Sequence, residues 1–590
     1  MCGIFGIVND GTSQAAQTVL DGLKKLEYRG YDSWGIAIIP KSGGRIRIEK
    51  HVGKIGSAKT TLPDSTIAIG HTRWATHGGV TDINAHPHLD CSGQIAVIHN
   101  GIVENYQDLK EELKREKHTF HSETDTEVIA HAIEEELKTG RSINHAVFSV
   151  FNTLVGSNAI GVLDLHAGSI VICRNGSPLA IGIGSNSYYL GSDVTAFLKF
   201  TRRVYFLADG EAAVLTVNGV KLYDISSQAE KKLVTHTVDW KVEDVQKGGY
   251  PHFLLKEIIE QTATIKKTAR LNETELKQIA KKIADGGRVV LCGCGTAFYC
   301  ALAAKYYFSL AGIEAQAYGA YEFLPFAKFA DKKTLFIAIS QSGETADTLI
   351  AAKAAKKNGA HLIAVVNARA STLERLSDTI IAVGAGPEIA VVSTKAFTAQ
   401  LATLYLLSRA VGGKYKEAQK AMTNLGAVLE KWLTPKNRTA ILNLAKKLID
   451  YEDMYLIGKH LNFPAAMEFA LKIKETSYIH AEAFASGELK HGVITLIQKG
   501  TPCFALFAND ETRQEVLSSA TELKARGATI IGISPFAAPE FNYHIQTPEL
   551  GDLTIFGNII VGQLLGYYLG IGRGTDPDKP RNLAKSVTVK

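Results

Sequence analysis

Short apolar or alternating segments dominate the first 233 residues, and they predict a region built mainly from β-strands. The clearest of these segments are residues 36–39, 67–70, 95–98 and 169–172. Longer helical patterns interrupt them at residues 15–26, 106–117 and 126–137. Strands of this kind with helices between them indicate sheets that pack face to face, with the helices outside.

Beyond residue 272 the pattern changes to strands that alternate with helices, and this pattern occurs twice. In the first copy the apolar segments are residues 288–293, 335–339 and 362–366. Their counterparts in the second copy are residues 453–458, 503–507 and 530–533. The offset between the copies is nearly constant, which is typical of an internal repeat. Alternating strands and helices predict two doubly wound parallel sheets, each with helices on both faces.

The chain is therefore expected to be an α/β multidomain protein with five segments. We expect an N-terminal domain over residues 2–235, a linker with a connecting helix over 236–272, a first doubly wound domain over 273–425, a second over 440–575, and a tail over 576–590. The linker assignment rests on the polar stretch 236–249, which ends in two glycines before Tyr250 and Pro251.

Composition narrows the functional class. The chain has 590 residues, 46% of them hydrophobic and 21% charged, which is ordinary for a globular protein of several domains. The net charge of +6 is small, and the basic runs alternate with acidic or apolar residues, so we expect no nucleic-acid partner. Seven cysteines without disulfide-like spacing favour a reduced, cytoplasmic compartment.

Residues 553–572 carry no charge over a length that could cross a membrane. They also contain Asn558, Gln563 and five glycines, and a helix buried on all sides of a large α/β domain has the same composition. The buried helix is favoured, and no membrane partner is expected. The sequence indicates no metal cluster and no cofactor fingerprint, because Gly293, Cys294 and Gly295 lack the third glycine of a dinucleotide motif.

Cys2 follows the initiator methionine, so removal of Met1 would place a thiol and a free α-amine on one residue. The α-amine titrates near pKa ~7.7–8.0 and can act as a base at neutral pH. A thiol beside such a base is an activated nucleophile. The alternative is that Cys2 merely starts the buried strand over residues 4–8.

Polar clusters at the ends of predicted strands bear on this choice. They are HTRWATHG at residues 71–78, HNG at 99–101 and SETDT at 122–126. Each cluster alone is explained by turns and helix caps. Together with a nucleophile, however, Asn100 and the N–H of Gly101 could stabilise an oxyanion, while Arg73 and Asp125 could bind a substrate that carries a carboxylate and an ammonium group.

These motifs, with MCGI at residues 1–4 and LEYRGYDS at 26–33, resemble the glutaminase domain of the N-terminal-nucleophile glutamine amidotransferases, most closely the branch that acts on fructose 6-phosphate. The resemblance implies a four-layered αββα fold that releases ammonia from glutamine. It implies Cys2 as the nucleophile and Asn100 with Gly101 as the oxyanion hole. It also implies further roles, with glutamine bound by Arg73, Thr76, His77 and Asp125, the pocket shaped by Arg29, and a gate at Trp74.

The first α/β copy has a loop rich in hydroxyl groups between a strand and a helix, formed by Ser340, Gln341, Ser342, Gly343, Glu344 and Thr345. Hydroxyl groups and backbone N–H groups at the N-terminus of a helix bind anions, so this loop predicts a phosphate site. The second copy has Asn509, Asp510 and Glu511 at the same place, and its charge would repel phosphate. A plain helix cap is the alternative for the first loop.

The second half resembles paired sugar isomerase (SIS) domains. The motifs that carry this resemblance are GCGT at 293–296, SQSGET at 340–345, VVSTK at 391–395, KIKE at 472–475, GELKHG at 487–492 and PRNLAKSVTV at 580–589. It implies that fructose 6-phosphate and glutamine become glucosamine 6-phosphate and glutamate, with ammonia channelled between the sites. It also implies a homodimer.

The resemblance assigns roles in the sugar site. It implies His491 for ring opening, Lys585 for holding the ketose as an imine, and Glu475 for moving the proton, with Lys472 tuning Glu475. The sugar phosphate would be bound by Thr296, Ser340, Gln341, Ser342, Thr345, Val391, Ser393 and Lys472.

Two positions depart from the family pattern, since Ala297 replaces a serine and Val493 replaces a proline. We expect weaker sugar-phosphate binding from the first change. Two other functions remain open, namely an amidotransferase with a different acceptor and a sugar-phosphate sensor that has lost catalysis. Intact Cys2, Asn100, Gly101 and Lys585 argue against the sensor.

Overall fold

The computed structural model describes residues 2–11, 14–238, 242–369 and 371–588. The chain divides into two compact units. The first comprises Met1–Val245 with Ala584–Lys590, and the second comprises Gln246–Leu583. Each unit has its own sheets and its own buried core.

The first unit contains two antiparallel sheets. One has the order β15-β11-β9-β10-β1-β4-β2-β3, and the other has the order β14-β13-β12-β8-β7-β6-β5. The strands of the first sheet are β1 (Gly3–Asn9), β2 (Ser33–Pro40), β3 (Arg47–Val52), β4 (Ser65–Arg73), β9 (Ala180–Ile183), β10 (Ser187–Gly191), β11 (Arg203–Phe206) and β15 (His236–Thr237). Those of the second are β5 (His88–Leu89), β6 (Ile95–Gly101), β7 (Asn158–Asp164), β8 (Ser169–Asn175), β12 (Glu211–Thr216), β13 (Gly219–Asp224) and β14 (Glu230–Lys231).

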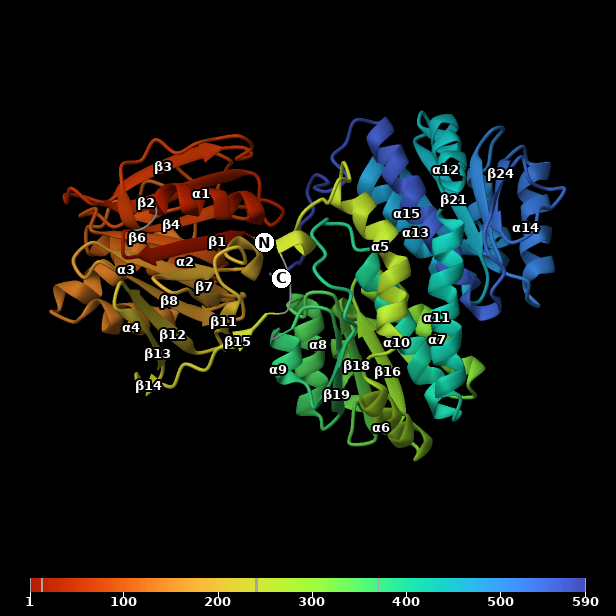
Figure 1. Ribbon diagram of the computed structural model, residues 1–590, viewed down its shortest axis with the longest axis horizontal. Coiled ribbons are helices and arrows are strands. Elements are labelled where there is room, and N and C mark those ends of the chain that lie inside the picture. Colours follow the sequence, from red (N-terminus) through yellow and green to blue (C-terminus); the bar gives the residue numbers. More distant parts are fainter. Residues whose placement is uncertain (1, 12–13, 239–241, 370, 589–590) are drawn as a thin grey trace. The chain divides into compact units, whose positions relative to one another are not determined.

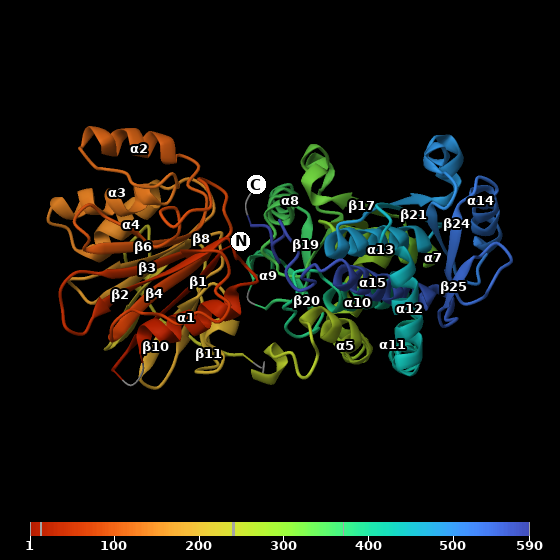
Figure 2. The ribbon, with the colours of Figure 1, turned by 90° about the horizontal axis from the view of Figure 1, so that it is seen from above.

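The helices of the first unit lie outside the two sheets, which gives four layers (Figure 2). The helix α1 (Ala15–Leu26) packs on β1 and β4, while α3 (Glu127–Lys138) and α4 (Ile143–Thr153) pack on the other sheet, with α2 (Tyr106–Arg115) against α3. Buried aliphatic side chains such as Ile4, Ile69 and Ile98 fill the space between the sheets. The predicted αββα fold is therefore confirmed, although α4 was not predicted.

The second unit contains two parallel sheets of five strands each. When the strands of each sheet are numbered along the chain, both sheets have the spatial order 2-1-3-4-5. These orders are β17-β16-β18-β19-β20 and β22-β21-β23-β24-β25. The strands are β16 (Arg288–Gly293), β17 (Ala315–Gly319), β18 (Thr334–Ser340), β19 (His361–Val366), β20 (Thr379–Ala382), β21 (Asp453–Gly458), β22 (His480–Ala485), β23 (Pro502–Leu506), β24 (Thr529–Ser534) and β25 (Tyr543–Gln546). The predicted doubly wound α/β class is confirmed.

Helices surround both parallel sheets (Figure 1). They are α5 (Phe253–Thr268), α6 (Glu273–Ala284), α7 (Thr296–Leu310), α8 (Ala346–Lys357), α9 (Thr372–Leu376), α10 (Lys395–Val411), α11 (Tyr415–Trp432), α12 (Pro435–Leu448), α13 (Asn462–Ser477), α14 (Arg513–Ala525) and α15 (Thr554–Gly572). A single apolar core joins side chains from both α/β domains, including Phe308, Leu404 and Phe469.

The apolar helix α15 packs against α12 and α13 inside the second unit. Together with the turn before it, Gly551–Gly572 is long and apolar enough to cross a membrane, but 83% of its apolar window is buried. Asn558 donates from Nδ2 to Asn462 Oδ1 at 2.8 Å and Thr547 donates to Asn558 Oδ1 at 2.9 Å, so its polar side chain is satisfied inside the protein. Its composition is therefore that of a core helix.

Candidate active sites

Strand pairing places Cys2 at the centre of the first unit's larger sheet. Strand β1 pairs antiparallel with both β10 and β4, and Gly3 lies opposite Thr72. The start of β1 therefore meets the end of β4, where Arg73 and Trp74 follow. Strand β6 of the second sheet ends nearby with Asn100 and Gly101, because β6 contacts both β1 and β4.

The thiol of Cys2 lies against the backbone of Trp74. The N–H of Trp74 donates to Sγ at 3.3 Å, and Sγ lies 3.6 Å from the Trp74 carbonyl oxygen. Burial raises the pKa of the Cys2 thiol, while the Trp74 N–H and the charge of Arg73 act in the opposite direction. A base is therefore needed to form the thiolate at neutral pH, and the α-amine of a processed N-terminus can supply it.

The side-chain amide of Asn100 is held in one orientation. Its Nδ2 donates to the carbonyl oxygen of Cys2 at 3.0 Å, and its Oδ1 accepts from His71 Nε2 at 3.2 Å. Burial lowers the pKa of His71 to about 3, so the ring is neutral. Because Nε2 also contacts the carbonyl oxygen of His99 at 2.9 Å, this nitrogen must carry the proton. His71 therefore turns the donor group of Asn100 toward Cys2.

Gly101 completes this corner of the site. Its φ is +140°, and a Cβ atom there would lie 2.0 Å from the carbonyl oxygen of Ser157. Only glycine fits both the conformation and the space. The structure thus brings Cys2, Asn100 and Gly101 together, as the sequence analysis expected.

Arg73 and Asp125 lie close enough to Cys2 for their charges to affect it. The buried guanidinium of Arg73 donates to the carbonyl oxygen of Gly79 at 3.0 Å and of Gly78 at 3.2 Å, and it also contacts that of His77. Asp125 Oδ2 accepts from the N–H of Val103 at 2.8 Å. Arg73 therefore fixes the loop that carries the predicted glutamine-binding residues.

Three further predicted residues of this pocket, Thr76, His77 and Arg29, make side-chain contacts in two separate groups. Thr76 Oγ1 lies 3.4 Å from His77 Nδ1 on the loop after β4. Arg29 donates to Asp193 Oδ2 at 2.8 Å, and the hydroxyl of Tyr28 donates to the same oxygen at 2.7 Å.

The segment 122–126 differs from the cap that its sequence indicates. Thr126 precedes α3, but its side chain caps no backbone N–H and instead contacts His99 Nδ1 at 2.9 Å. The carboxylate of Glu127 accepts from the N–H groups of His121 at 2.8 Å and Ser122 at 2.7 Å. The start of the segment is therefore fixed by Glu127, which is the first residue of α3.

In the second unit, the predicted phosphate loop lies between β18 and α8. Ser340 Oγ accepts from the N–H of Gly343 at 2.9 Å and lies 3.4 Å from Thr345 Oγ1. Gly343 has a φ of +66°, and a Cβ atom there would lie 2.1 Å from Ser371 Oγ. Gln341 accepts at its carbonyl from the N–H of Ala368 at 3.0 Å. Thr345 is the N-cap of α8, and its side chain accepts no backbone N–H, which leaves the first N–H groups of the helix without a side-chain cap.

A buried ion cluster lies beside this loop's sheet, on one face of α13. Lys472 Nζ lies 2.6 Å from Glu475 and 3.3 Å from Glu468. It also donates to Thr296 Oγ1 at 3.0 Å and to the carbonyl oxygen of Ser393 at 3.3 Å. The structure therefore brings together Thr296, Ser393, Lys472 and Glu475, four residues that the sequence analysis assigned to sugar-phosphate chemistry.

Electrostatics in this cluster favour a charged lysine and a partly protonated acid. Burial raises the pKa of Glu468 to about 7, with Lys472 acting against the rise. Burial disfavours the charge on Lys472, but Glu468 and Glu475 outweigh it and raise the pKa of the lysine. The sequence analysis missed Glu468, although Glu468, Lys472 and Glu475 are spaced i, i+4 and i+7 on one helix face.

The other predicted residues lie outside this cluster. The N–H of Val391 donates to the carbonyl oxygen of Asp578 at 3.0 Å. His491 ends the short helix η5 (Ser486–His491) with an exposed side chain, and within the described part of the unit no hydrogen bond links it to Glu475. Lys585 belongs to the tail segment that groups with the first unit.

Comparison with known proteins matches these two units to two domain families. Residues 50–234 match the glutamine amidotransferase domain, and residues 282–410 and 447–540 match the SIS domain. A solved structure titled as the C-terminal domain of glucosamine-fructose-6-phosphate aminotransferase from Francisella tularensis covers 57% of the chain and 99% of that structure, with a TM-score of 0.51 and 32% identity.

Several relatives match the chain over its whole length. The glutamine–fructose-6-phosphate aminotransferases (isomerizing) of Thermococcus kodakarensis and Pyrococcus horikoshii are 42% and 41% identical to the chain, with complete coverage of both sequences. That of Caldanaerobacter subterraneus is 40% identical, again over the whole of both chains. The chain therefore belongs to the glutamine–fructose-6-phosphate aminotransferase (isomerizing) family.

Proposed function

We propose that the protein converts fructose 6-phosphate and glutamine into glucosamine 6-phosphate and glutamate, the first step of amino-sugar synthesis. The observation that supports this proposal is that one chain of this family contains both groups of residues predicted for the two reactions. Cys2 faces the fixed amide of Asn100, and Lys472 joins Thr296, Ser393 and Glu475.

In the glutaminase step, the Cys2 thiolate attacks the side-chain amide carbon of glutamine. Asn100 Nδ2 and the Gly101 N–H would stabilise the negative oxygen that forms. Ammonia leaves after it takes a proton, and water then hydrolyses the thioester to glutamate. Arg73, Thr76, His77 and Asp125 would bind the α-carboxylate and α-ammonium groups, Arg29 would shape the pocket, and Trp74 would act as its gate.

In the sugar step, phosphate would bind at the N-terminus of α8, through Ser340, Gln341, Ser342 and Thr345. His491 would open the ring, and Lys585 would hold the ketose as an imine until ammonia replaces it. Glu475 would then move a proton from carbon 1 to carbon 2. Lys472, held by two carboxylates, would position and tune Glu475 as the base.

The test is an assay of glucosamine 6-phosphate formed from glutamine and fructose 6-phosphate. Cys2→Ala should abolish this synthesis and leave the isomerisation of fructose 6-phosphate to glucose 6-phosphate intact, whereas Glu475→Gln should lose both. Survival of glutamine-dependent synthesis in Cys2→Ala would show that Cys2 is not the nucleophile. Mass spectrometry of active enzyme should find Met1 removed, because retained Met1 would rule out the α-amine as base.

We also propose a cytoplasmic homodimer with an internally repeated sugar-isomerase half. The identical strand order of the two parallel sheets supports the repeat, and seven free cysteines fit a reducing compartment. The exposed His491 fits a role in the site of a neighbouring copy. If it acts there, a mixture of His491→Ala and Glu475→Gln subunits should regain isomerase activity that neither variant has alone, and no recovery would contradict a shared site.

A further inference from the structure

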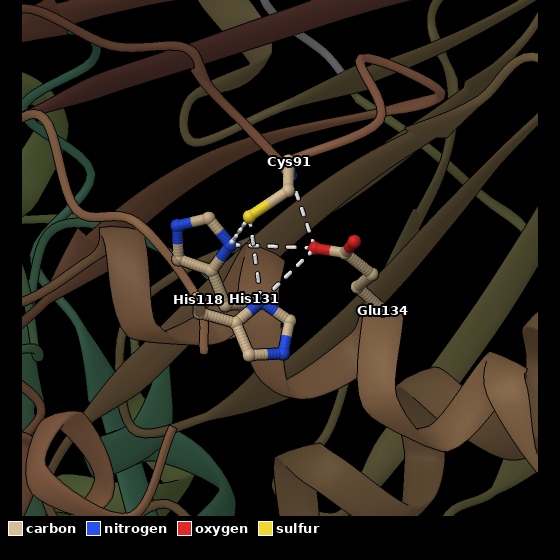
Figure 3. Close-up of side chains that lie close together, drawn as sticks. All are labelled: Cys91, His118, His131 and Glu134. Carbon is tan, nitrogen blue, oxygen red and sulfur yellow. Dashed lines mark hydrogen bonds and ion pairs between the residues drawn. The ribbon is translucent and has the colours of Figure 1, made fainter. Parts of the chain in front are cut away.

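A cluster of potential metal ligands lies in the first unit, among residues that the proposed reaction does not use. It consists of Cys91, His118, His131 and Glu134, whose candidate ligand atoms all lie within 4.8 Å of one another (Figure 3). Their spacing along the chain follows no metal-binding motif, so the sequence alone did not indicate them.

The four side chains come from three separate pieces of structure. Cys91 lies in the turn after β5, and His118 follows the end of α2. His131 and Glu134 are spaced i, i+3 on α3 and therefore share one face of the helix. Both histidine side chains are buried, with exposed fractions of 2% and 1%, while Cys91 is exposed and leaves a path to solvent.

The distances match a tetrahedral zinc site. Zinc bonds of about 2.3 Å to sulfur and about 2.0 Å to nitrogen or oxygen imply roughly 3.6 Å between a sulfur and a nitrogen ligand, and roughly 3.3 Å between nitrogen and oxygen ligands. Cys91 Sγ lies 3.5 Å from Nδ1 of both His118 and His131. Glu134 Oε2 lies 3.2 Å from His118 Nδ1 and 3.4 Å from His131 Nδ1.

The outer nitrogens of both rings face carboxylates. His118 Nε2 lies 2.5 Å from Glu135 Oε1, and His131 Nε2 lies 3.6 Å from Glu127 Oε1. A carboxylate behind each histidine is the usual second layer of a zinc site, where it fixes the tautomer and makes the ligand nitrogen more basic. A simple hydrogen-bonded cluster would not need both Nδ1 atoms to converge on the same thiol and the same carboxylate oxygen.

The scaffold around the cluster is ordered by hydrogen bonds of its own. Asp90 accepts from the N–H groups of Gln94 and Ile95, both at 2.8 Å, which fixes the turn that carries Cys91. The N–H of Cys91 donates to Glu134 Oε2 at 3.0 Å. Lys117 has a φ of +69°, and the N–H of His118 donates to the carbonyl oxygen of Leu113 at 3.0 Å, so the end of α2 turns His118 inward.

We propose that Cys91, His118, His131 and Glu134 bind one divalent cation of the zinc class, in a closed four-ligand site with a structural role. The Cys91 thiol gives its proton to solvent on binding, and the site joins α3 to the β5 turn and to the end of α2. Glu127 links this site to the segment before α3, because it faces His131 and accepts from the N–H groups of His121 and Ser122. Asp125, proposed to bind glutamine, lies in that segment.

Metal content of the purified full-length enzyme tests the proposal. After incubation with zinc and desalting, the wild type should hold about one equivalent per chain, and Cys91→Ser and His131→Gln should hold at least tenfold less. His166→Ala is the matched control, because His166 is an exposed histidine of the same unit that contacts Gln94 and lies outside the cluster. A wild type without zinc, or equal zinc in wild type and both ligand variants, would overturn the proposal.

Cobalt gives a readout on the wild type that does not depend on whether the variants fold. Chelator-treated enzyme loaded with Co²⁺ should show the visible bands of tetrahedral cobalt and a thiolate-to-cobalt charge-transfer band. Chelation should also lower the melting temperature of the first unit, and zinc should restore it. Absence of the charge-transfer band in loaded wild type would contradict Cys91 as a ligand, and an unchanged melting temperature would contradict the structural role.

Discussion

At the scale of single residues, Gly101 shows how a backbone position constrains the proposed chemistry. Its φ of +140° lies in the region that favours glycine, and the carbonyl oxygen of Ser157 occupies the place of a Cβ atom. A residue with a side chain could not adopt this backbone conformation. The N–H of residue 101, which is proposed to stabilise the oxyanion, therefore keeps its direction only if the residue is glycine.

Gly101→Ala is expected to lower the glutaminase kcat by roughly 10²–10³, the usual loss when an oxyanion donor is displaced. Gly93→Ala is the control, because Gly93 also has a positive φ of +70° but meets nothing within 4 Å. Steady-state glutamate release measures both variants. Equal losses in the two would mean that backbone strain alone, and not the oxyanion site, causes the effect.

The buried acid Glu468 predicts a pH dependence of stability. Its pKa is about 7 in the folded protein, against about 4.3 in an unfolded chain. The folded state therefore binds the proton more tightly, and the stability present below about pH 4.3 is lost as the pH rises through about 7. Lys472 is the partner that limits this loss.

Glu468→Gln, which mimics the protonated acid, should raise the melting temperature relative to wild type more at pH 8 than at pH 5. Glu482→Gln, an exposed carboxylate on β22, should show no such difference. Calorimetry at both pH values makes the comparison. A larger gain at pH 5 than at pH 8 would contradict the raised pKa.

Which side chains lie together was predictable from the sequence where short motifs follow strand ends. Cys2, Asn100 and Gly101 lie in short motifs, and strand ends brought them together. Glu468 was missed although it shares a helix face with Lys472 and Glu475, which is a signal that spacing along the chain contains. The contact of Glu468 with Thr296, 172 residues away, and that of His71 with Asn100, 29 residues away, depend on the packed fold and could not be predicted from spacing.

At the scale of elements, the N-termini of α8 and α14 differ although the two helices follow equivalent strands. Before α8, hydroxyl groups surround helix N–H groups that the Thr345 side chain does not cap. Before α14, Asp510 accepts from both the N–H of Thr512 at 2.9 Å and its hydroxyl at 2.6 Å. The carboxylate of Asp510 thus already occupies the N-terminus of α14, where it would repel a phosphate group.

Thr345→Val should therefore raise the KM for fructose 6-phosphate by about tenfold, the loss of one charge-assisted hydrogen bond, and leave glutaminase activity unchanged. Thr512→Val at the equivalent helix should leave this KM unchanged. Kinetics with varied sugar phosphate distinguish the two. A rise in KM of similar size for both variants would place the phosphate elsewhere.

The helices α1, α2 and α3 begin within one residue of their predicted starts. The helix α4 was missed although the apolar positions of its sequence, INHAVFSVFNT, follow a helical spacing, with Val147, Val150 and Phe151 buried. Its valine and phenylalanine content suits a strand, so propensity and spacing disagree in this segment. The helix packs against the second sheet and α3, which agrees with the spacing.

At the scale of the whole molecule, the chain has two compact units with separate cores. The predicted boundary at residue 425 lies inside α11, whereas the connecting helix expected within 236–272 forms α5, which packs on α10 and α11. Domain limits depend on such contacts between distant segments, which the sequence pattern does not contain.

Two units should give two thermal transitions. Fructose 6-phosphate should raise the transition of the sugar-isomerase unit more than that of the first unit, which contributes only the tail residue Lys585 to the proposed sugar site. Differential scanning calorimetry with and without the sugar phosphate, and with glucose as the control, makes the measurement. A single transition that shifts as a whole would show that the units unfold together.

The cap of α5 has a consequence for how the protein is made. The N–H groups of Phe253 and Leu254 donate to the carboxylate of Asp578 at 3.0 Å and 2.8 Å. The N-terminus of α5 therefore lacks these hydrogen bonds until a residue some 324 positions later has been synthesised. The strands around Cys2, in contrast, are nearly complete once residue 237 has left the ribosome. We expect the glutaminase half to fold during translation, while the sugar-isomerase half can complete its folding only when synthesis of the chain is almost finished. Premature termination between residue 237 and Asp578 would then produce a chain that can bind glutamine but cannot use the ammonia.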